Sequence, residues 1–450
     1  MKKSQQATPQ DETVSANRRQ VLLGGIGLAA GTALAPGQAF AKSTEEEAGQ
    51  GQVAEAPIAG KTVKQRVPFH GEHQAGIVTP RPANGIVASF NVIADDPEDL
   101  EALFRELTAR IAFLTQGGEV PELNPKLPPA DSGILGPVIE PDKLTVTVSL
   151  GASLFDKRPW LRELKPKQLI RMAEFPNDAL DSEICHGDLA LQLCANLQDT
   201  CIHALRDIMK NMPEYLVLHW MQEGNVPVVQ ASAGGEHGTA RNFLGFHDGS
   251  ANPNSTDAKE MDRIVWVTED NGEPDWAMGG SYQAVRIIRN FVERWDRTPL
   301  GEQELIFGRK KDSGAPLDGG KTEFAVPDYA KDPDGKKTPL DSHIRLANPR
   351  TAKSQKNLIL RRPFNYSNGF TKSGQLDQGL LFIVYQADLM EGFLAVQSRL
   401  NGEPLEEYIK PIGGGYFFVL PGARDRDDYL GRTLIEAIRS EPSQQAAEGL

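Results

Sequence analysis

The stretch Leu144-Thr145-Val146-Thr147-Val148-Ser149-Leu150 alternates apolar and polar side chains without interruption. This period of two is typical of a β-strand. Upstream of it, residues 86–93 form another strand-like run, and Asp96-Pro97-Glu98 then begins a helix with acidic side chains in its first turn. The apolar residues of that helix fall on one face, namely Leu100, Leu103, Phe104, Leu107, Ile111 and Leu114.

Downstream, residues 189–210 have the composition of a long helix, and residues 215–221 form another strand-like run. We interpret this part of the chain as a β-α-β-β-α-β order. That order is typical of a ferredoxin-like α+β sandwich.

A similar order is expected to recur after a Gly- and Asn-rich joint around residues 245–255. The expected elements are strands at 264–267, 282–288, 380–385 and 416–420, and a helix from Thr298-Pro299 to about Phe307. Residues 309–341, called the excursion below, are crowded with Lys, Asp, Gly and Pro, and long loops in compact domains are usually functional. The predicted fold is therefore α+β, with two ferredoxin-like halves that are each an antiparallel sheet covered by helices.

The predicted boundaries are a flexible lead-in at 42–66, an N-terminal domain at 67–244, a C-terminal domain at 245–440 and a tail at 441–450. Of the 450 residues 39% are hydrophobic, which is the profile of a folded protein. The chain has 61 Asp and Glu against 48 Lys and Arg, a formal charge of -13, and no long basic block. Nucleic acid is therefore excluded as a partner.

The first forty residues have the pattern of an export signal. Arg18-Arg19 precedes a mildly apolar, Gly- and Ala-rich run, and Ala39-Phe40-Ala41 has the small residues that a signal peptidase accepts. We interpret residues 1–41 as a twin-arginine signal with cleavage near Ala41, which predicts a periplasmic protein. The alternative is a membrane anchor, but the apolar run is shorter than the roughly 20 residues that cross a bilayer. The twin-arginine route carries proteins that are already folded, which points to a cofactor.

The three cysteines, Cys185, Cys194 and Cys201, are an odd number and cannot form a complete disulfide framework. We interpret them as buried thiols.

Three polar stretches are candidates for chemistry: Gly245-Phe246-His247-Asp248-Gly249-Ser250-Ala251-Asn252-Pro253, then 341–350, then 360–367. Glycines around a single carboxylate allow the backbone to turn tightly, and Asn-Pro favours an exit turn. Taken alone, the first stretch reads as a turn. The histidine of 341–350 reads as a loop residue, and the arginine pair Arg361-Arg362 reads as surface charge.

Taken together, these stretches resemble the dye-decolourising peroxidase family over most of the chain. The GxxDG signature stands at 245–249, and further matching pieces are the His186–Cys194 segment, Phe307-Gly308-Arg309-Lys310 and His343-Ile344-Arg345. With its export signal, the chain is most similar to the deferrochelatase/peroxidase branch that works beside bacterial ferrous-iron uptake systems. The fold that this resemblance implies is of the dimeric α+β barrel type.

The resemblance implies one non-covalent haem b per chain, with His343 as the proximal ligand of the iron and Asp248 and Arg361 as the catalytic pair. Arg362 is the alternative to Arg361. Pro363-Phe364 departs from the family pattern, which leaves the shape of the pocket there open.

Further cofactor-binding candidates are weaker. Gly249 follows the catalytic carboxylate, and Leu381 and Phe382 fit an apolar wall of the haem pocket. Asp388 fits either a hydrogen-bond acceptor behind the proximal imidazole or a helix cap. The chain has no Cys-x-x-Cys-His, which excludes covalent c-type attachment. The other histidines have no metal-binding spacing and are expected to be structural or exposed: His70, His73, His186, His203, His219, His237 and His247.

Three functional hypotheses follow. The first is a peroxidase that reduces hydrogen peroxide with one-electron donors such as dyes, phenols or ferrous iron. The second is a deferrochelatase that releases iron from haem with the porphyrin intact. The third is a haem carrier without turnover, which would have no use for a catalytic acid and arginine together. The expected partners are periplasmic iron-uptake components and further copies of the chain in a homodimer or larger assembly, without stable membrane insertion.

Overall fold

The computed structural model describes residues 64–120, 124–227 and 239–440. Nine strands of this part form one antiparallel sheet in the order β7-β11-β4-β5-β1-β6-β9-β10-β8, and β7 also pairs with β10. Because β7 has β11 on one side and β10 on the other, eight of the strands close into a ring. The short strand β8 pairs with the last part of β10, at Val384 and Tyr385.

The first half of the ring has the strand order β4-β5-β1-β6, with α1 and α3 as its long helices. Its elements are β1 (Asn84–Val92), α1 (Pro97–Gln116), β4 (Thr145–Gly151), α2 (Ala152–Asp156), β5 (Leu189–Ala195), α3 (Gln198–Asn211) and β6 (Leu216–Asn225). The short strands β2 (Gly118–Glu119) and β3 (Val138–Ile139) form a separate pair. The long strands and helices follow the predicted β-α-β-β-α-β order.

The second half repeats this arrangement, because its strand order is β9-β10-β7-β11. Its strands are β7 (Ser281–Asn290), β9 (Phe364–Phe370), β10 (Leu376–Gln386) and β11 (Ile409–Val419). In each half the first and third strands lie at the centre and the second and fourth lie outside. The prediction of two ferredoxin-like α+β halves is therefore confirmed.

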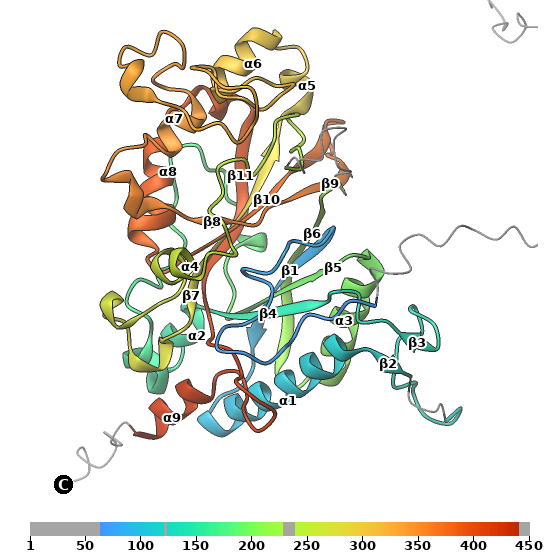
Figure 1. The fold of residues 1–450 in the computed structure, drawn as a ribbon. Coiled ribbons are helices and arrows are strands. Elements are labelled where there is room, and N and C mark those ends of the chain that lie inside the picture. Colours follow the sequence, from blue (N-terminus) through green and yellow to red (C-terminus); the bar gives the residue numbers. More distant parts are fainter. Residues whose placement is uncertain (1–63, 121–123, 228–238, 441–450) are drawn as a thin grey trace, which may run out of the picture. The chain divides into compact units, whose positions relative to one another are not determined.

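Most of the helices after residue 240 belong to the long connections of the second half (Figure 1). They are α4 (Ala258–Ile264), α5 (Val292–Trp295), α6 (Leu300–Phe307), α7 (His343–Ala347) and α8 (Ala395–Leu400), with a π-helical turn at Met390–Leu394 before α8. The short strand β8 (Leu360–Arg361) precedes β9. The last helix, α9 (Arg432–Ser440), packs against α1 of the first half. Where one domain ends and the next begins stays a prediction, since a single sheet runs through both halves.

Helix α1 begins where the sequence predicts. The Asp96 carboxylate accepts a hydrogen bond from the backbone N–H of Asp99 at 2.8 Å, and Pro97 occupies the first turn. All six apolar residues assigned to its inner face are buried. The three cysteines are buried and unpaired, as predicted.

Two element predictions are wrong. Residues 189–195 are strand β5, and the helix begins only at Gln198. Every residue of β5 is buried, so the good helix formers Leu, Ala and Gln are held in a strand by neighbours on both sides. Residues 264–267, predicted as a strand, instead end helix α4 and continue as a buried turn, because Asp257 caps that helix.

The apolar core is divided by the ring. One cluster collects alternate residues of β1, β5, β6, β7, β9, β10 and β11, including Leu381, Ile383 and Tyr385, and fills the inside of the ring. A larger cluster packs beneath α1, α3 and α9 on the outer face of the sheet. Successive residues of one strand therefore lie on opposite faces of the sheet, one inside the ring and the next on its outer face.

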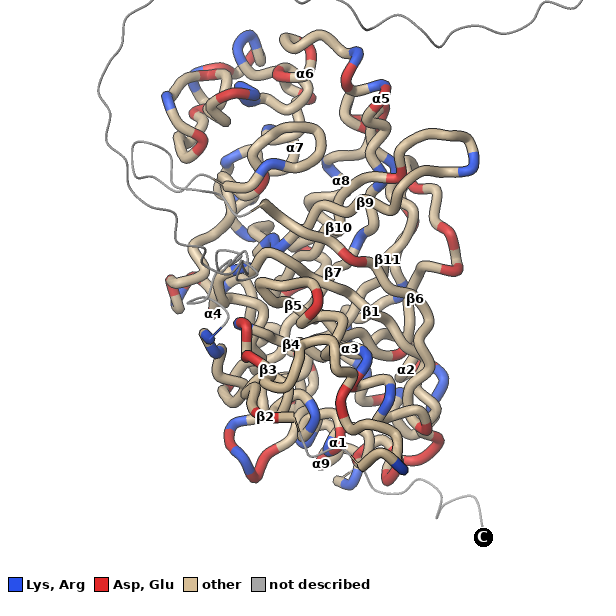
Figure 2. The backbone as a smooth tube through the Cα atoms, turned by 90° about the vertical axis from the view of Figure 1, so that its right-hand side faces the viewer, with Lys and Arg blue, Asp and Glu red and all other residues tan. Residues whose placement is uncertain are grey.

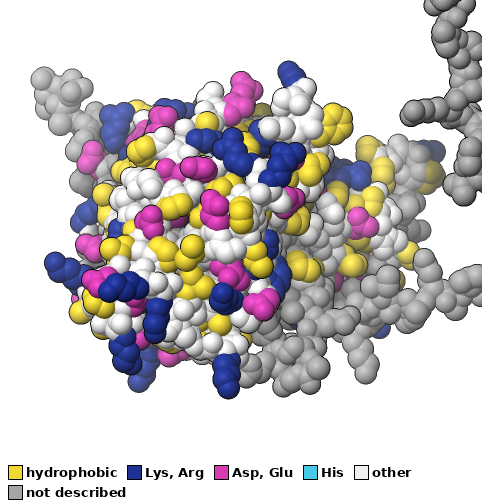
Figure 3. Space-filling model, turned by 90° about the horizontal axis from the view of Figure 1, so that it is seen from above, with side chains coloured by type: hydrophobic (Ala, Val, Ile, Leu, Met, Phe, Trp, Pro, Cys, Tyr) yellow, Lys and Arg dark blue, Asp and Glu magenta, His cyan; other side chains and the backbone are white. Residues whose placement is uncertain are grey.

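Charged residues of both signs are interspersed along the backbone (Figure 2), and the face seen from above carries small apolar patches between them (Figure 3). Among the residues that the structure describes, no helix is long and apolar enough to cross a membrane. The predicted signal at 1–41, most of the lead-in, the tail at 441–450 and His237 lie outside the described residues. The excursion is described throughout and contains no strand, only a 3₁₀ turn at Tyr329–Lys331.

Candidate active site

A cavity lies on the outer face of the second half, between strands β7 and β10 and helices α7 and α8. Its walls include Ile288 of β7 and Phe382 of β10. His343, Asp248 and Arg361 also line it, although they are far apart in the sequence. The fold thus brings together the three residues on which the sequence-based site depends.

His343 is the first residue of α7, and Ser342 occupies the position before it. The His343 Nδ1 atom lies 2.7 Å from Oε2 of Glu403, a side chain that is only 3% exposed. Burial lowers the pKa of His343, but the charge of Glu403 and its hydrogen bond raise that pKa by more, so it lies above its ordinary value. Because Glu403 engages Nδ1, Nε2 is the ring nitrogen left to bind a ligand in the cavity.

Asp248 lies in a tight turn whose shape requires glycine. Gly245 has a φ of 85° and Gly249 a φ of 128°, both in the region that side chains disfavour. The backbone N–H of Asp248 donates to the carbonyl of Ala240 at 2.8 Å. Its carboxylate is 8% exposed, with Oδ1 lying 2.8 Å from Arg361 Nη2 and Oδ2 accepting from Asn242 at 3.4 Å. Gly249 lines the cavity beside this carboxylate.

Arg361 is tied to the same turn by its backbone. The Asn252 side chain accepts from the Arg361 N–H at 2.8 Å and donates to the Arg361 carbonyl at 2.9 Å. The guanidinium lies 5.3 Å above the ring of Phe382. Asn252, which follows the GxxDG signature, therefore sets the spacing between the carboxylate and the arginine.

Arg362 turns away from the cavity. Its guanidinium is buried and donates to the carbonyls of Thr79, Ile77 and Pro80 in the first half. Of the two neighbouring arginines, only Arg361 lines the cavity with Asp248.

The remaining sequence candidates are separated by the fold. Phe382 lines the cavity, whereas Leu381 is fully buried inside the ring, because successive residues of a strand point to opposite faces. Asp388 accepts a hydrogen bond from the N–H of Glu391 at 2.7 Å, which is a helix-capping contact. The acceptor behind the His343 imidazole is Glu403, which sequence reasoning missed because it follows sixty positions later, in an Asn-Gly-Glu-Pro turn.

Two further arginines line the cavity, and we did not assign them from the sequence. Arg309 donates to the main-chain carbonyls of Gly314 and Glu323, and Arg350 stands at a φ of 58°. Within the described part of the chain, neither Nε of Arg350 nor the hydroxyl of Tyr329, which also lines the cavity, has a hydrogen-bond partner. Buried polar groups without partners are typical of a place where a polar ligand binds.

The same cavity contains His247, which we expected to be structural or exposed. Its Nδ1 lies 2.9 Å from the carbonyl of Thr239 and 3.3 Å from Oε1 of Glu323. Over the ranges that the structure covers, no three His, Cys, Asp or Glu side chains gather to hold a bare metal ion.

Known proteins resemble this chain over most of its length. Two family models match it, the N-terminal part of the Dyp-type peroxidases at residues 74–225 and the C-terminal part at 239–424. A deferrochelatase of Escherichia coli O6:K15:H31 is 57% identical over 418 residues, which is 93% of this chain and 96% of the relative. That of Escherichia coli K12 is 58% identical over 385 residues, 85% of this chain and 90% of the relative.

Solved structures give the same result. A DyP-type peroxidase from Cellulomonas bogoriensis is 34% identical with a TM-score of 0.73, and the match covers 83% of this chain and 99% of that one. Ferric DtpA from Streptomyces lividans is 33% identical with a TM-score of 0.74, covering 85% and 100%. The chain therefore belongs to the Dyp-type peroxidase family, and it is a haem-dependent peroxidase that reduces peroxide with electron donors.

Proposed function

We propose that the cavity holds one non-covalent haem b per chain, with His343 Nε2 as the ligand that would bind its iron and Asp248 and Arg361 as the catalytic pair. The observation that carries this proposal is that the three side chains line one cavity, while Arg362 and Leu381 do not. When bound, haem would supply the iron at which peroxide is reduced and through which electrons from the donor pass.

The residues of the cavity fit this group. A haem site of this kind offers a ligand for the iron, such as an imidazole nitrogen, an apolar wall, and cations for the two carboxylates. His343 offers the nitrogen, and Ile288 and Phe382 belong to an apolar wall. Arg350 has a buried Nε without a hydrogen-bond partner in the part that the structure describes, so we assign it to a haem carboxylate.

Asp248 would take a proton from hydrogen peroxide and return it to the oxygen that leaves as the O–O bond breaks. Arg361 would keep a fixed positive charge beside the oxygen that becomes negative as the O–O bond breaks. The 2.8 Å ion pair between the two side chains supports these two roles, since it holds the carboxylate and the guanidinium next to each other in the cavity.

Glu403 would act through His343. A carboxylate that accepts from Nδ1 fixes the orientation of the imidazole and makes Nε2 a stronger donor. The short contact and the nearly complete burial of Glu403 support this role.

The test is an absorption spectrum of the haem-loaded protein before and after one equivalent of hydrogen peroxide. We expect a rapid spectral change in the parent and a strongly slowed one in Asp248→Asn, with the haem content unchanged. Asp334→Asn is the matched control, because that carboxylate is 69% exposed and pairs with Lys336 in the excursion. Slow bleaching in both parent and Asp248→Asn would contradict the proposal.

A second candidate activity is the release of iron from haem with the porphyrin intact. Identity of 57% to curated deferrochelatases over most of both chains favours it. It would use the same cavity and the same His343. Incubation of the haem-loaded protein with a reductant, without peroxide, should then yield ferrous iron and metal-free porphyrin in equal molar amounts. The porphyrin is measured by its fluorescence. A non-catalytic haem carrier would give neither this product nor the peroxide-dependent spectral change.

We also propose export to the periplasm by the twin-arginine route, with cleavage near Ala41, and association with iron-uptake components and with further copies of the chain. The Arg18-Arg19 pair and the Ala39-Phe40-Ala41 site support the export. Replacement of both arginines by lysine should retain the full-length chain in the cytoplasm. N-terminal sequencing of the periplasmic fraction would check the cleavage position.

A further inference from the structure

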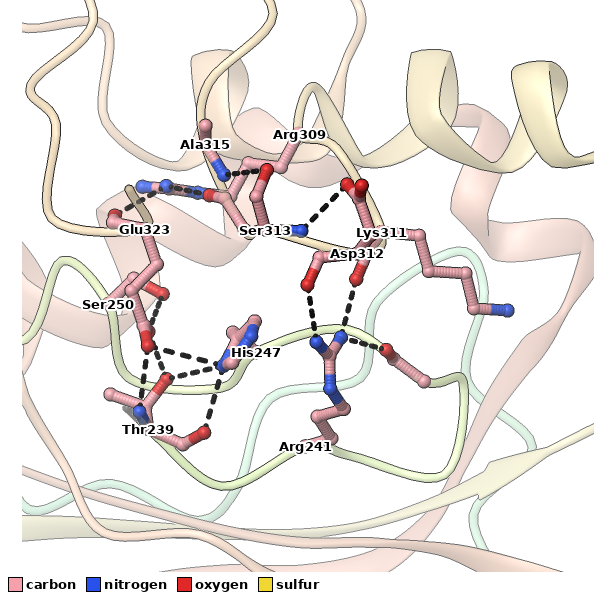
Figure 4. Close-up of polar contacts among 12 residues, drawn as sticks. Thr239, Arg241, His247, Ser250, Arg309, Lys311, Asp312, Ser313, Ala315 and Glu323 are labelled. Carbon is pink, nitrogen blue, oxygen red and sulfur yellow. Dashed lines mark hydrogen bonds and ion pairs between the residues drawn. The ribbon is translucent and has the colours of Figure 1, made fainter. Parts of the chain in front are cut away.

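The carboxylate of Glu323 joins the excursion to the turn that carries Asp248 (Figure 4). Its Oε1 accepts the backbone N–H of Thr239 at 2.8 Å, and its Oε2 accepts the hydroxyl of Ser250 at 2.6 Å and also the hydroxyl of Thr239. His247 Nδ1 lies 3.3 Å from Oε1. One side chain of the excursion thus contacts the turn at three different residues.

These contacts lie on both sides of Asp248 in the sequence. Ser250 comes two positions after it, and Thr239 is next to Ala240, whose carbonyl accepts the Asp248 N–H. Glu323 therefore connects the two strands of backbone that meet at the catalytic carboxylate. If Glu323 is removed, the segment at Ser250 and the segment at Thr239 both lose their hydrogen bonds to this side chain.

The surroundings of Glu323 favour the ionised form of its carboxylate. It is 5% exposed, and burial alone would raise its pKa. The hydrogen bonds from Ser250 and Thr239 and the nearby His247 together lower the pKa by more, so that it lies below the ordinary value. A buried anion held by hydrogen bonds from one turn makes strong, directional contacts with that turn.

A second contact fastens the other end of the turn. Arg241 donates to the carbonyl of Gly245 at 2.8 Å and to the excursion carbonyls of Asp312, at 2.7 Å, and Lys311. This contact holds Gly245 at the start of the GxxDG stretch, whereas Glu323 contacts Thr239, His247 and Ser250 (Figure 4).

We propose that Glu323 is a positioning residue for the peroxide step, which holds Asp248 at its distance from Arg361 through Thr239 and Ser250. The excursion then fixes the position of the turn that carries Asp248. This inference rests on the role proposed above for Asp248.

The first measurement needs no cofactor. In the haem-free chain, amide hydrogen exchange at residues 239–250 should be about tenfold faster or more in Glu323→Gln and Glu323→Ala than in the parent. The matched control is Glu304→Gln, because Glu304 accepts from Lys310 Nζ at 2.7 Å and from the Lys311 N–H at 3.0 Å but has no hydrogen bond to the turn. It should leave the exchange of residues 239–250 unchanged.

The second measurement separates positioning from a merely structural role. In the haem-loaded protein, both Glu323 variants should lower kcat/KM for hydrogen peroxide by about 10- to 100-fold, at unchanged haem content and unchanged KM for the electron donor. Thr239→Ser, which keeps the hydroxyl, should behave as the parent. Thr239→Val, which loses it, should behave as Glu323→Gln.

The outcomes are distinguishable. Faster exchange with an unchanged kcat/KM, or unchanged exchange, in both Glu323 variants would overturn the inference. If Asp248→Asn is impaired and the Glu323 variants are not, this inference alone fails. If Asp248→Asn reacts with peroxide as fast as the parent, the proposed function fails and this inference fails with it.

Discussion

The two halves of the ring have the same strand order but differ in what covers their outer faces. In the first half, α1 and α3 place buried apolar residues against the sheet and leave a solid core. In the second half, the chain between β7 and β9 runs from residue 291 to 363 and includes the excursion, His343 and Arg361. There the sheet carries a cavity. The two halves share the same strand arrangement. The segments that connect the strands determine whether the outer face of the sheet is covered by an apolar core or borders a cavity.

The strongest test of this difference compares one buried carboxylate from each half. Asp188 of the first half accepts the Val92 N–H at 3.1 Å, contacts Lys157 Nζ at 3.0 Å and also accepts from Ser153. Asp248→Asn should slow the reaction with peroxide by about 10²- to 10⁴-fold. Asp188→Asn should leave that rate per bound haem unchanged but lower the free energy of unfolding by about 1–3 kcal/mol.

Stopped-flow absorption and urea unfolding of both variants check this pair of expectations. A slowed peroxide reaction in Asp188→Asn at full haem content would remove the functional distinction between the halves.

Two phenylalanines compare the covered face with the cavity wall. Phe104 of α1 is fully buried, so Phe104→Ala should cost about 3–5 kcal/mol of unfolding free energy. Phe382 borders the cavity and is only half-buried, so Phe382→Ala should cost less than about 2 kcal/mol in the haem-free protein. Urea unfolding of the haem-free variants measures both. Equal losses would mean that the cavity wall packs like the core.

The smallest expected effect is a difference in pH dependence. The pKa of Glu323 lies below the ordinary value of 4.5, so this group adds stability that is lost as the pH falls through its folded pKa. Burial raises the pKa of Asp142, in the first half, above its ordinary value of 3.8 despite hydrogen bonds from Leu197 and Thr200. The folded state therefore resists ionisation of Asp142. As the pH rises above 3.8, this group lowers the free energy of unfolding of the protein.

Thermal unfolding between about pH 3.5 and 6 tests both signs. As the pH rises, the parent should gain stability relative to Glu323→Gln and lose it relative to Asp142→Asn. Parallel curves for the parent and either variant would contradict the corresponding sign.

Much of the fold could be predicted from local patterns. The cap at Asp96, the alternation at 144–150 and the strand runs at 282–288 and 380–385 report the geometry of single elements. Strand β5 could not be found in this way, because residues that are buried on both faces do not alternate and its composition favours a helix. The predicted β-α-β-β-α-β order of the first half is nevertheless correct, with the third strand lying inside the residues that were assigned to a helix.

The site, like the fold, could be predicted only in part. Asp248, His343 and Arg361 could be named because each lies in a recognisable stretch, but their meeting in one cavity depends on tertiary structure. The partner of His343 could not be predicted, since Glu403 comes from a turn after α8 that has no motif of its own. Arg350 stood in a quoted stretch, but the sequence could not show that its Nε is buried without a hydrogen-bond partner in the part of the chain that the structure describes, which is the observation behind its proposed role.

The closed ring has two unequal seams between its halves. Strands β4 and β11 share three residue pairs, from Gly151↔Phe417 to Ser149↔Val419, and β6 and β9 share a single pair, Asn225↔Asn365. Few ladder pairs therefore join the halves at these seams. Backbone hydrogen bonds outside the ladders, such as the His186 N–H to the Gly414 carbonyl at 2.7 Å, add to them, together with side-chain packing and α9. We expect a pulling force applied across these seams to separate the ring at β4–β11 and β6–β9. Each half would keep its four strands, and the second half would keep the cavity.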